Sequence, residues 1–153
     1  MDDVNQLQSQ YLDFLTSLLR EGLVDVQFMQ LLELESVAGA EPQFLSDIVN
    51  EFFDASDKIV HQFDIAIEHQ QVDAILKDTV YKFRGTNVSI GAKKVTTLCL
   101  GFEDDYNTHN YEGCLQCLPQ IKDEYHVLKN KLQTVFSLQQ QIVSAGGSIP
   151  VLG

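Results

Sequence analysis

Hydrophobic residues recur every three or four positions along almost the whole chain, which is the spacing of an amphipathic helix, and the two-residue alternation of a strand is absent. Six such segments follow one another, at residues 4–18, 25 to about 39, 42 to about 69, 73–90, 95 to about 106, and 110–143. Because short turns separate them, neighbouring helices are expected to run antiparallel. The pattern predicts an all-α fold: an antiparallel four-helix bundle made of the last four helices, with two additional N-terminal helices packed across one end.

Several helix boundaries coincide with residues of known preference. Asp25 is a typical N-cap, Pro42 suits the first turn of a helix, and Gly91 interrupts the pattern after residue 90. Pro119 lies inside the last segment, where it removes a backbone hydrogen bond, so a kink is predicted there. No long linker divides the sequence. We predict a single domain over 1–153, with N-terminal helices at about 3–38, a bundle core at about 42–143 and a short C-terminal tail at 144–153.

The chain is strongly acidic, with 22 acidic and 10 basic residues and a formal net charge of −12. Such a charge repels nucleic acid and anionic lipid. No apolar run approaches the ~20 residues that a membrane span requires, and the acidic N-terminus lacks the charged-then-apolar pattern of a signal peptide. We therefore expect no nucleic acid and no membrane as partners, a cytoplasmic and nuclear location, and another protein as the ligand.

The three cysteines, Cys99, Cys114 and Cys117, are too few and too oddly numbered for a disulfide framework. Cys114 and Cys117 have the spacing of a redox or zinc pair, but a second ligand pair at the usual spacing is missing. Both also fall in a helical pattern. They are interpreted as reduced packing residues, and no metal and no cofactor is expected.

Basic residues are concentrated in one stretch of this acidic chain. Between positions 77 and 94 Asp78 is the only acid, although half of the ten basic residues lie there: Lys77, Lys82, Arg84, Lys93 and Lys94. A charge cluster of this kind is usually a solvated helix face. It also suits an acidic protein partner.

Helical geometry, at ~100° per residue, separates the two faces of the segment 73–90. Its core face is predicted to consist of Leu76, Val80, Phe83, Asn87 and Ile90. Tyr81 then points to solvent, and Lys77, Arg84, Gly85 and Val88 lie on the same general side. Gly85 costs the helix ~1 kcal/mol relative to alanine, but its missing side chain would let a partner approach closely.

The stretch from Val80 to Ala92 reads Val-Tyr-Lys-Phe-Arg-Gly-Thr-Asn-Val-Ser-Ile-Gly-Ala. It resembles the signature of the histidine-containing phosphotransfer proteins of plants, His-Gln-Leu-Lys-Gly-Ser-Ser followed by small residues and Ile-Gly-Ala, with Tyr81 in place of the histidine. The resemblance extends over essentially the whole chain, through Gln6-Leu-Gln, Phe52-Phe53, Asn110-Tyr-Glu-Gly-Cys and Ala145-Gly-Gly. This sequence departs from the usual Gln, Leu, Ser, Ser and small residue at Lys82, Phe83, Thr86, Asn87 and Val88.

In that family the histidine accepts a phosphoryl group from a receiver-domain aspartate and passes it to another. Imidazole suits this relay because its ordinary pKa of ~6.5 leaves much of it neutral, whereas a phenol, with an ordinary pKa of ~10, stays protonated and would form an ester that does not return readily to a carboxylate. The resemblance therefore implies a pseudo-phosphotransfer protein that is not an enzyme and has no catalytic residue. It would still dock on receiver domains of response regulators and sensor histidine kinases, and would damp cytokinin-type two-component signalling. The partner-binding residues expected from it are Lys77, Tyr81, Lys82, Arg84, Gly85 and Val88.

Two alternatives stay open. The chain could be an active phosphotransfer carrier that uses Tyr81 or another histidine. Tyr81 is followed three residues later by Arg84 and then by Gly85, a pattern that none of the four histidines shows: His61, His69, His109 and His126. It could also be a helical scaffold with unrelated partners. Assays of receiver-domain binding and of labelled phosphate transfer distinguish these hypotheses.

Overall fold

The computed structural model describes residues 2–37 and 43–152, and within these ranges it contains six α-helices and no strand. The prediction of an all-α fold is confirmed. The helices are α1 (Asp2–Arg20), α2 (Val26–Val37), α3 (Phe44–His69), α4 (Ala74–Ile90), α5 (Lys93–Asn107) and α6 (Tyr111–Ser144).

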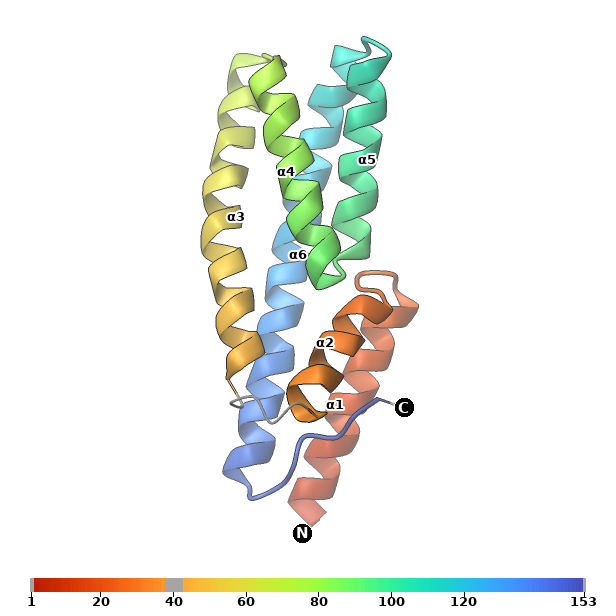
Figure 1. The fold of residues 1–153 in the computed structure, drawn as a ribbon, viewed down its shortest axis with the longest axis vertical. Coiled ribbons are helices and arrows are strands. Elements are labelled where there is room, and N and C mark those ends of the chain that lie inside the picture. The colour runs from red at the N-terminus through yellow and green to blue at the C-terminus, as the bar shows by residue number, and fades with distance from the viewer. Residues whose placement is uncertain (1, 38–42, 153) are drawn as a thin grey trace.

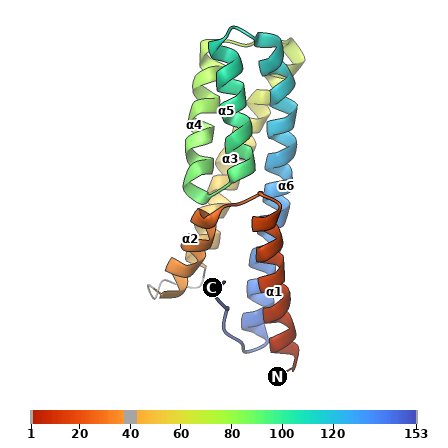
Figure 2. The same cartoon turned by 90° about the vertical axis from the view of Figure 1, so that its right-hand side faces the viewer.

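The two longest helices, α3 and α6, run side by side along the length of the molecule (Figures 1 and 2). α4 and α5 cover their upper parts in the view of Figure 1 and complete an antiparallel four-helix bundle. α1 and α2 lie below α4 and α5, against the lower parts of the long helices. The expected bundle of the last four helices, with the first two at one end, is confirmed.

Side-chain caps begin two helices, and a glycine cap ends a third, at the residues that the sequence predicted. The Asp25 carboxylate accepts a hydrogen bond from the Gln27 N–H at 2.9 Å, and Asn110 caps α6 in the same way. Gly91 ends α4 in the left-handed conformation, with φ +79°. The predicted stop near Gly39 and the predicted start at Pro42 lie outside the described residues.

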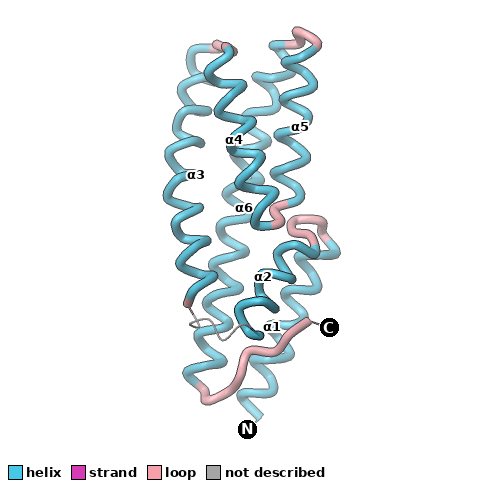
Figure 3. Tube along the Cα trace, in the orientation of Figure 1, coloured by secondary structure: helices cyan, strands magenta, loops and turns pink. Residues whose placement is uncertain are grey.

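The last helix is continuous from Tyr111 to Ser144, and Pro119 lies inside it. The helix therefore accommodates the proline without a break, and the kink stays a prediction. Beyond α6 the chain turns back across the lower end of the molecule (Figure 3). There the Gln8 side chain donates a hydrogen bond to the Ser148 carbonyl at 2.7 Å, which joins α1 to the C-terminal segment.

Buried residues from all six helices form one hydrophobic cluster. In the upper bundle Phe83 of α4 meets Phe63 of α3 and Tyr125 of α6 edge to face, with ring centroids 5.7 and 6.0 Å apart. Such aromatic pairs add stability beyond the area that they bury. The division of the chain at about residue 42 into N-terminal helices and bundle core stays a proposal.

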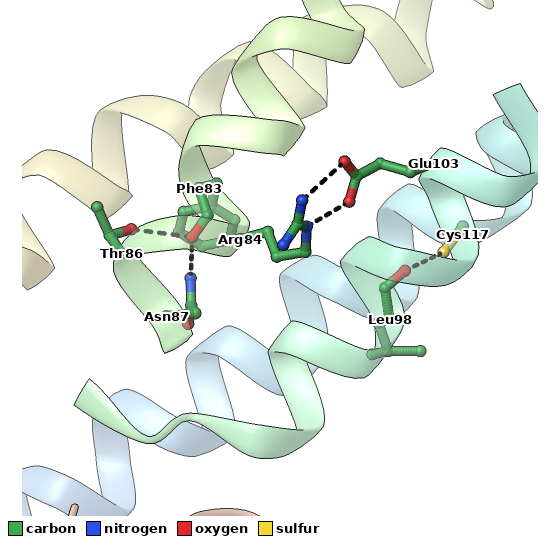
Figure 4. A network of polar contacts seen from close by, with 7 residues as sticks. All are labelled: Phe83, Arg84, Thr86, Asn87, Leu98, Glu103 and Cys117. Atoms are coloured by element: carbon green, nitrogen blue, oxygen red, sulfur yellow. Dashed lines mark hydrogen bonds and ion pairs between the residues drawn. The ribbon is translucent and has the colours of Figure 1, made fainter. Parts of the chain in front are cut away.

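All three cysteines are buried free thiols, which confirms their interpretation as packing residues. Burial raises the pKa of the Cys99 thiol to about 12. The Cys117 thiol donates to the Leu98 carbonyl at 3.2 Å, between α6 and α5 (Figure 4). Thiols in this state are poor nucleophiles and poor metal ligands.

A polar link joins α3 to α6 beside the aromatic cluster. The buried Tyr125 hydroxyl donates to the Asp57 carboxylate at 2.7 Å, and the Lys129 ammonium lies 2.8 Å from the other carboxylate oxygen. Burial alone would raise the pKa of Asp57, but the hydrogen bonds from Lys129 and Tyr125 outweigh it and hold the pKa below its ordinary value of 3.8.

Asp57→Asn is expected to lower stability at pH 7 by no more than about 1 kcal/mol, because water screens the half-exposed ion pair. A carboxyl whose pKa is lower in the folded than in the unfolded state stabilises the fold at any pH above its unfolded-state pKa. This stabilisation is lost as the pH falls through the folded-state pKa. The difference between wild type and variant should therefore shrink as the pH is lowered below 3.8. Urea unfolding at pH 7 and pH 3 measures it, with Asp123→Asn on the exposed face of α6 as the control. If wild type and Asp57→Asn differ in free energy of unfolding by the same amount at both pH values, the charge of Asp57 does not stabilise the contact between α3 and α6.

Candidate functional site

The core face predicted for α4 is confirmed, since all five of its residues are buried: Leu76, Val80, Phe83, Asn87 and Ile90. Asp73 caps this helix by accepting a hydrogen bond from the Leu76 N–H at 2.8 Å. The buried core face and the caps at both ends fix which side of α4 faces solvent. Tyr81 is consequently held outward, and 58% of its surface is exposed.

Arg84, one turn beyond Tyr81, is paired with a residue of the next helix. Its Nε donates to the Glu103 carboxylate at 2.6 Å and its Nη2 to the second oxygen at 3.4 Å (Figure 4). Its Cζ lies 4.9 Å from the centre of the Tyr81 ring. Hydrogen bonding to Glu103 raises the pKa of Arg84 further. The charged group in contact with Tyr81 is thus a cation, and a cation cannot remove a phenolic proton.

The other members of the basic cluster differ in how far their charge is available. The Lys77 ammonium lies 5.3 Å from the centre of the Tyr106 ring on α5. Lys94 is 3.3 Å from Glu124 of α6. Lys82 and Lys93 are exposed, and neither forms an ion pair with the residues that the structure describes. The cluster is therefore a set of free and paired cations, not a uniform basic surface.

Gly85 and Val88 continue the exposed side of α4 below Tyr81. A Cβ atom built on Gly85 would meet nothing within 4 Å. Val88 leaves about half of its side chain in solvent. The helix surface next to Tyr81 is consequently open, and a partner could reach the backbone there.

Comparison with known proteins places this geometry in a family. The chain is 39% identical over 151 residues to histidine-containing phosphotransfer protein 1 of Arabidopsis thaliana, covering 98% of this chain and 97% of that protein. The chain belongs to the plant histidine-containing phosphotransfer family. No model of a protein family matches it. The solved structure of a histidine-containing phosphotransfer protein from Medicago truncatula superimposes with a TM-score of 0.85 at 32% identity, over 97% of this chain and all of that one.

The family has members of two descriptions, and this chain resembles both. Pseudo histidine-containing phosphotransfer protein 6 of Arabidopsis thaliana is 32% identical over 146 residues, covering 94% of each chain. Relatives named without the prefix pseudo are phosphoryl carriers of two-component signalling rather than classical enzymes. In the described part of this chain, no helix combines the length and the apolar character that crossing a membrane would require.

The four histidines lie on α3, on α6 and in the turn before α6, and all are exposed, as expected of ordinary surface residues: His61, His69, His109 and His126. His109 occupies the turn between α5 and α6 with φ +61°, and its ring lies 3.1 Å from the Tyr111 hydroxyl. Within 2–37 and 43–152, no three acidic, histidine or cysteine side chains gather as a metal site would require.

Two residues at the site were not predicted from the sequence, Glu103 and Tyr106 on α5. Both meet cations of α4 across the hairpin that turns at Gly91 and Ala92. Residues at similar distances from such a turn lie level on antiparallel helices. The position of the turn therefore indicates the contact between Lys77 and Tyr106, but it does not identify the partner of Arg84, which depends on how the two helices pack together.

Proposed function

We propose that this chain is a pseudo-phosphotransfer protein, which docks on receiver domains of response regulators and sensor histidine kinases without relaying phosphate. It would occupy receivers in the cytoplasm and nucleus and damp cytokinin-type signalling. The observation that carries the proposal is the exposed Tyr81, which stands in the middle of α4 where the family signature has its histidine.

The surroundings of Tyr81 support docking. Receiver domains hold their phosphorylated aspartate in an acidic pocket, and Lys77 and Lys82 supply positive charge on a chain that is otherwise strongly acidic. Gly85 leaves room for the rim of that pocket. The loss of relay follows from chemistry, because a phenol is a poor acceptor at neutral pH and its phosphate ester is a poor donor.

Two measurements test the proposal. Purified protein is titrated with isolated receiver domains, and it is incubated with a receiver carrying labelled aspartyl phosphate. Histidine-containing phosphotransfer protein 1 of Arabidopsis thaliana serves as the positive control for transfer. We expect micromolar binding and no acid-labile label on this chain. The absence of binding to every receiver tested would refute docking.

Active phosphoryl transfer is the second candidate, and it is favoured by the 39% identity to a protein named as a phosphotransfer protein without the prefix pseudo. A carrier would take up the label on one of its exposed histidines. Acid-labile label in the same incubation would establish this candidate. Mapping the label by mass spectrometry would then identify the residue.

Gly85→Gln tests the open surface beside Tyr81. The substitution should stabilise the protein by about 0.5–1 kcal/mol, because glycine is a poor residue in a helix interior, yet it should weaken receiver binding about tenfold by filling the space that the partner needs. Gly101→Gln on α5 is the matched control, since its Cβ would also meet nothing within 4 Å. Thermal melting and receiver titration separate the two effects. Equal binding by both variants would show that the partner does not approach Gly85.

A further inference from the structure

An ion pair between Arg84 and Glu103 lies beside the Tyr81 ring. Two hydrogen bonds, at 2.6 and 3.4 Å, join the guanidinium to the carboxylate. The side chains are only 26% and 13% exposed. A two-pronged, partly buried pair of this kind is stronger and better ordered than a surface ion pair. Arg84 is therefore held on α5 in the free protein.

The held guanidinium lies where a phosphoryl group would need it. Arg84 follows Tyr81 by three residues, and its Cζ is 4.9 Å from the Tyr81 ring. An anion arriving at residue 81 comes within reach of this cation, but finds its Nε and Nη2 already bonded to Glu103. Arginine is well suited to phosphate because its planar fork binds two oxygens at once. In this chain the same fork is used on a carboxylate.

We propose that Glu103 regulates the docking face by holding Arg84 against α5, so that the guanidinium is withheld from an anionic group at residue 81. The inference rests on the proposed function and deepens it. Tyr81 removes the acceptor atom, and Glu103 removes the cation that would stabilise the transferred group. Attraction to the acidic receiver then depends on Lys77 and Lys82. Docking without transfer would thus be enforced at two positions on two helices.

Receiver binding by a Glu103→Gln variant of the otherwise unchanged chain tests whether Glu103 holds Arg84. Glu103→Gln keeps the shape of the side chain but removes its charge, so Arg84 becomes free to contact the receiver. We expect affinity to rise about fivefold and to fall more steeply with added salt, as for other charge pairs across interfaces. Glu124→Gln is the control, because it neutralises the partner of Lys94 in another ion pair between helices. Equal effects of both variants would overturn the proposal.

A double-mutant cycle separates positioning from simple repulsion. If Glu103 acts through Arg84, Glu103→Gln should have no effect on binding in a chain that already carries Arg84→Gln. If Glu103 merely repels an acidic partner, the gain would persist in that background. A persisting gain would therefore overturn the proposal, while leaving receiver docking itself intact.

Phosphoryl acceptance supplies a second readout in a chain that has an acceptor. In Tyr81→His, an imidazole nitrogen would form the N–P bond as the O–P bond of the receiver's aspartyl phosphate breaks, its electron pair leaving with the carboxylate. The free Arg84 guanidinium would neutralise the transferred oxygens. We expect Tyr81→His with Glu103→Gln to accept label at least about tenfold faster than Tyr81→His alone, the order of effect of one well-placed donor.

The outcomes distinguish this inference from the proposed function. Equal rates in the two histidine variants, including no transfer to either while the Arabidopsis phosphotransfer protein is labelled by the same receiver, would overturn the role of Glu103. Failure of the wild-type chain to bind any receiver would instead overturn docking, and the inference with it.

Discussion

Replacing Gly91 with alanine is expected to lower the free energy of unfolding by about 3 kcal/mol. Gly91 has φ +79°, a conformation that costs an alanine about 1–2 kcal/mol. Its Cβ would also lie 2.5 Å from the Phe28 backbone nitrogen and 2.6 Å from the Asp25 carboxylate. Relief of that overlap must move α2, and the hydrogen bond from the Asp25 N–H to the Gly91 carbonyl, 2.9 Å long, would be strained or broken.

Gly22→Ala is the control for Gly91→Ala. Gly22 has a similar φ of +71°, but a Cβ there would meet nothing within 4 Å. It should therefore cost only the backbone part, about 1 kcal/mol. Thermal melting checks both variants, and a loss of 3 kcal/mol corresponds to a Tm lower by about 10 °C for a chain of this size. If the two variants lose the same free energy of unfolding, the contact between Gly91 and α2 relaxes without strain.

Reversing the charges of Lys77 and Lys82 together is expected to weaken receiver binding about 100-fold. Lys82 is exposed, Lys77 is half-buried beside the Tyr106 ring, and neither is in an ion pair with the described residues, so no carboxylate there offsets their charges toward an acidic partner. Each reversal replaces an attraction by a repulsion, and a tenfold loss for each is of the size seen for charges at interfaces. Most of the loss should be in the association rate, and it should diminish at high salt.

The control reverses two lysines on other helices, Lys58 of α3 and Lys131 of α6, and so changes the net charge by the same amount. Stopped-flow association with a receiver domain at 50 and 500 mM salt gives both rates. If the control pair weakens binding as much as the α4 pair, the overall charge of the chain governs association and α4 is not the docking face.

The family relationship gives these experiments a reference protein. Histidine-containing phosphotransfer protein 1 of Arabidopsis thaliana, 39% identical over almost the whole chain, can be tested beside this chain with the same receivers. A difference in transfer with similar binding would locate the functional change at residue 81 and its neighbours. A difference in binding would instead point to the charge pattern on α4 and α5.

Much of the helical content was predictable because its signals are local. The spacing of hydrophobic residues gave the six helices, and Asp73, Gly91 and Asn110 bound them through hydrogen bonds and dihedral angles that involve only residues nearby in sequence. The outward direction of Tyr81 followed in the same way, since a turn of ~100° per residue fixes it relative to the buried Phe83. The register between α4 and α5 had no comparable local signal.

By itself the sequence determined which face of each helix is buried, that Tyr81 stands on an exposed surface, and that Gly85 leaves that surface open. Only the tertiary structure decided that Arg84 is paired with Glu103 and that Gly91 touches α2. The physical reason is the range of the interactions. Periodicity reports the contrast between core and solvent along one helix, whereas the partner of a charge depends on how two helices are aligned when their cores pack together.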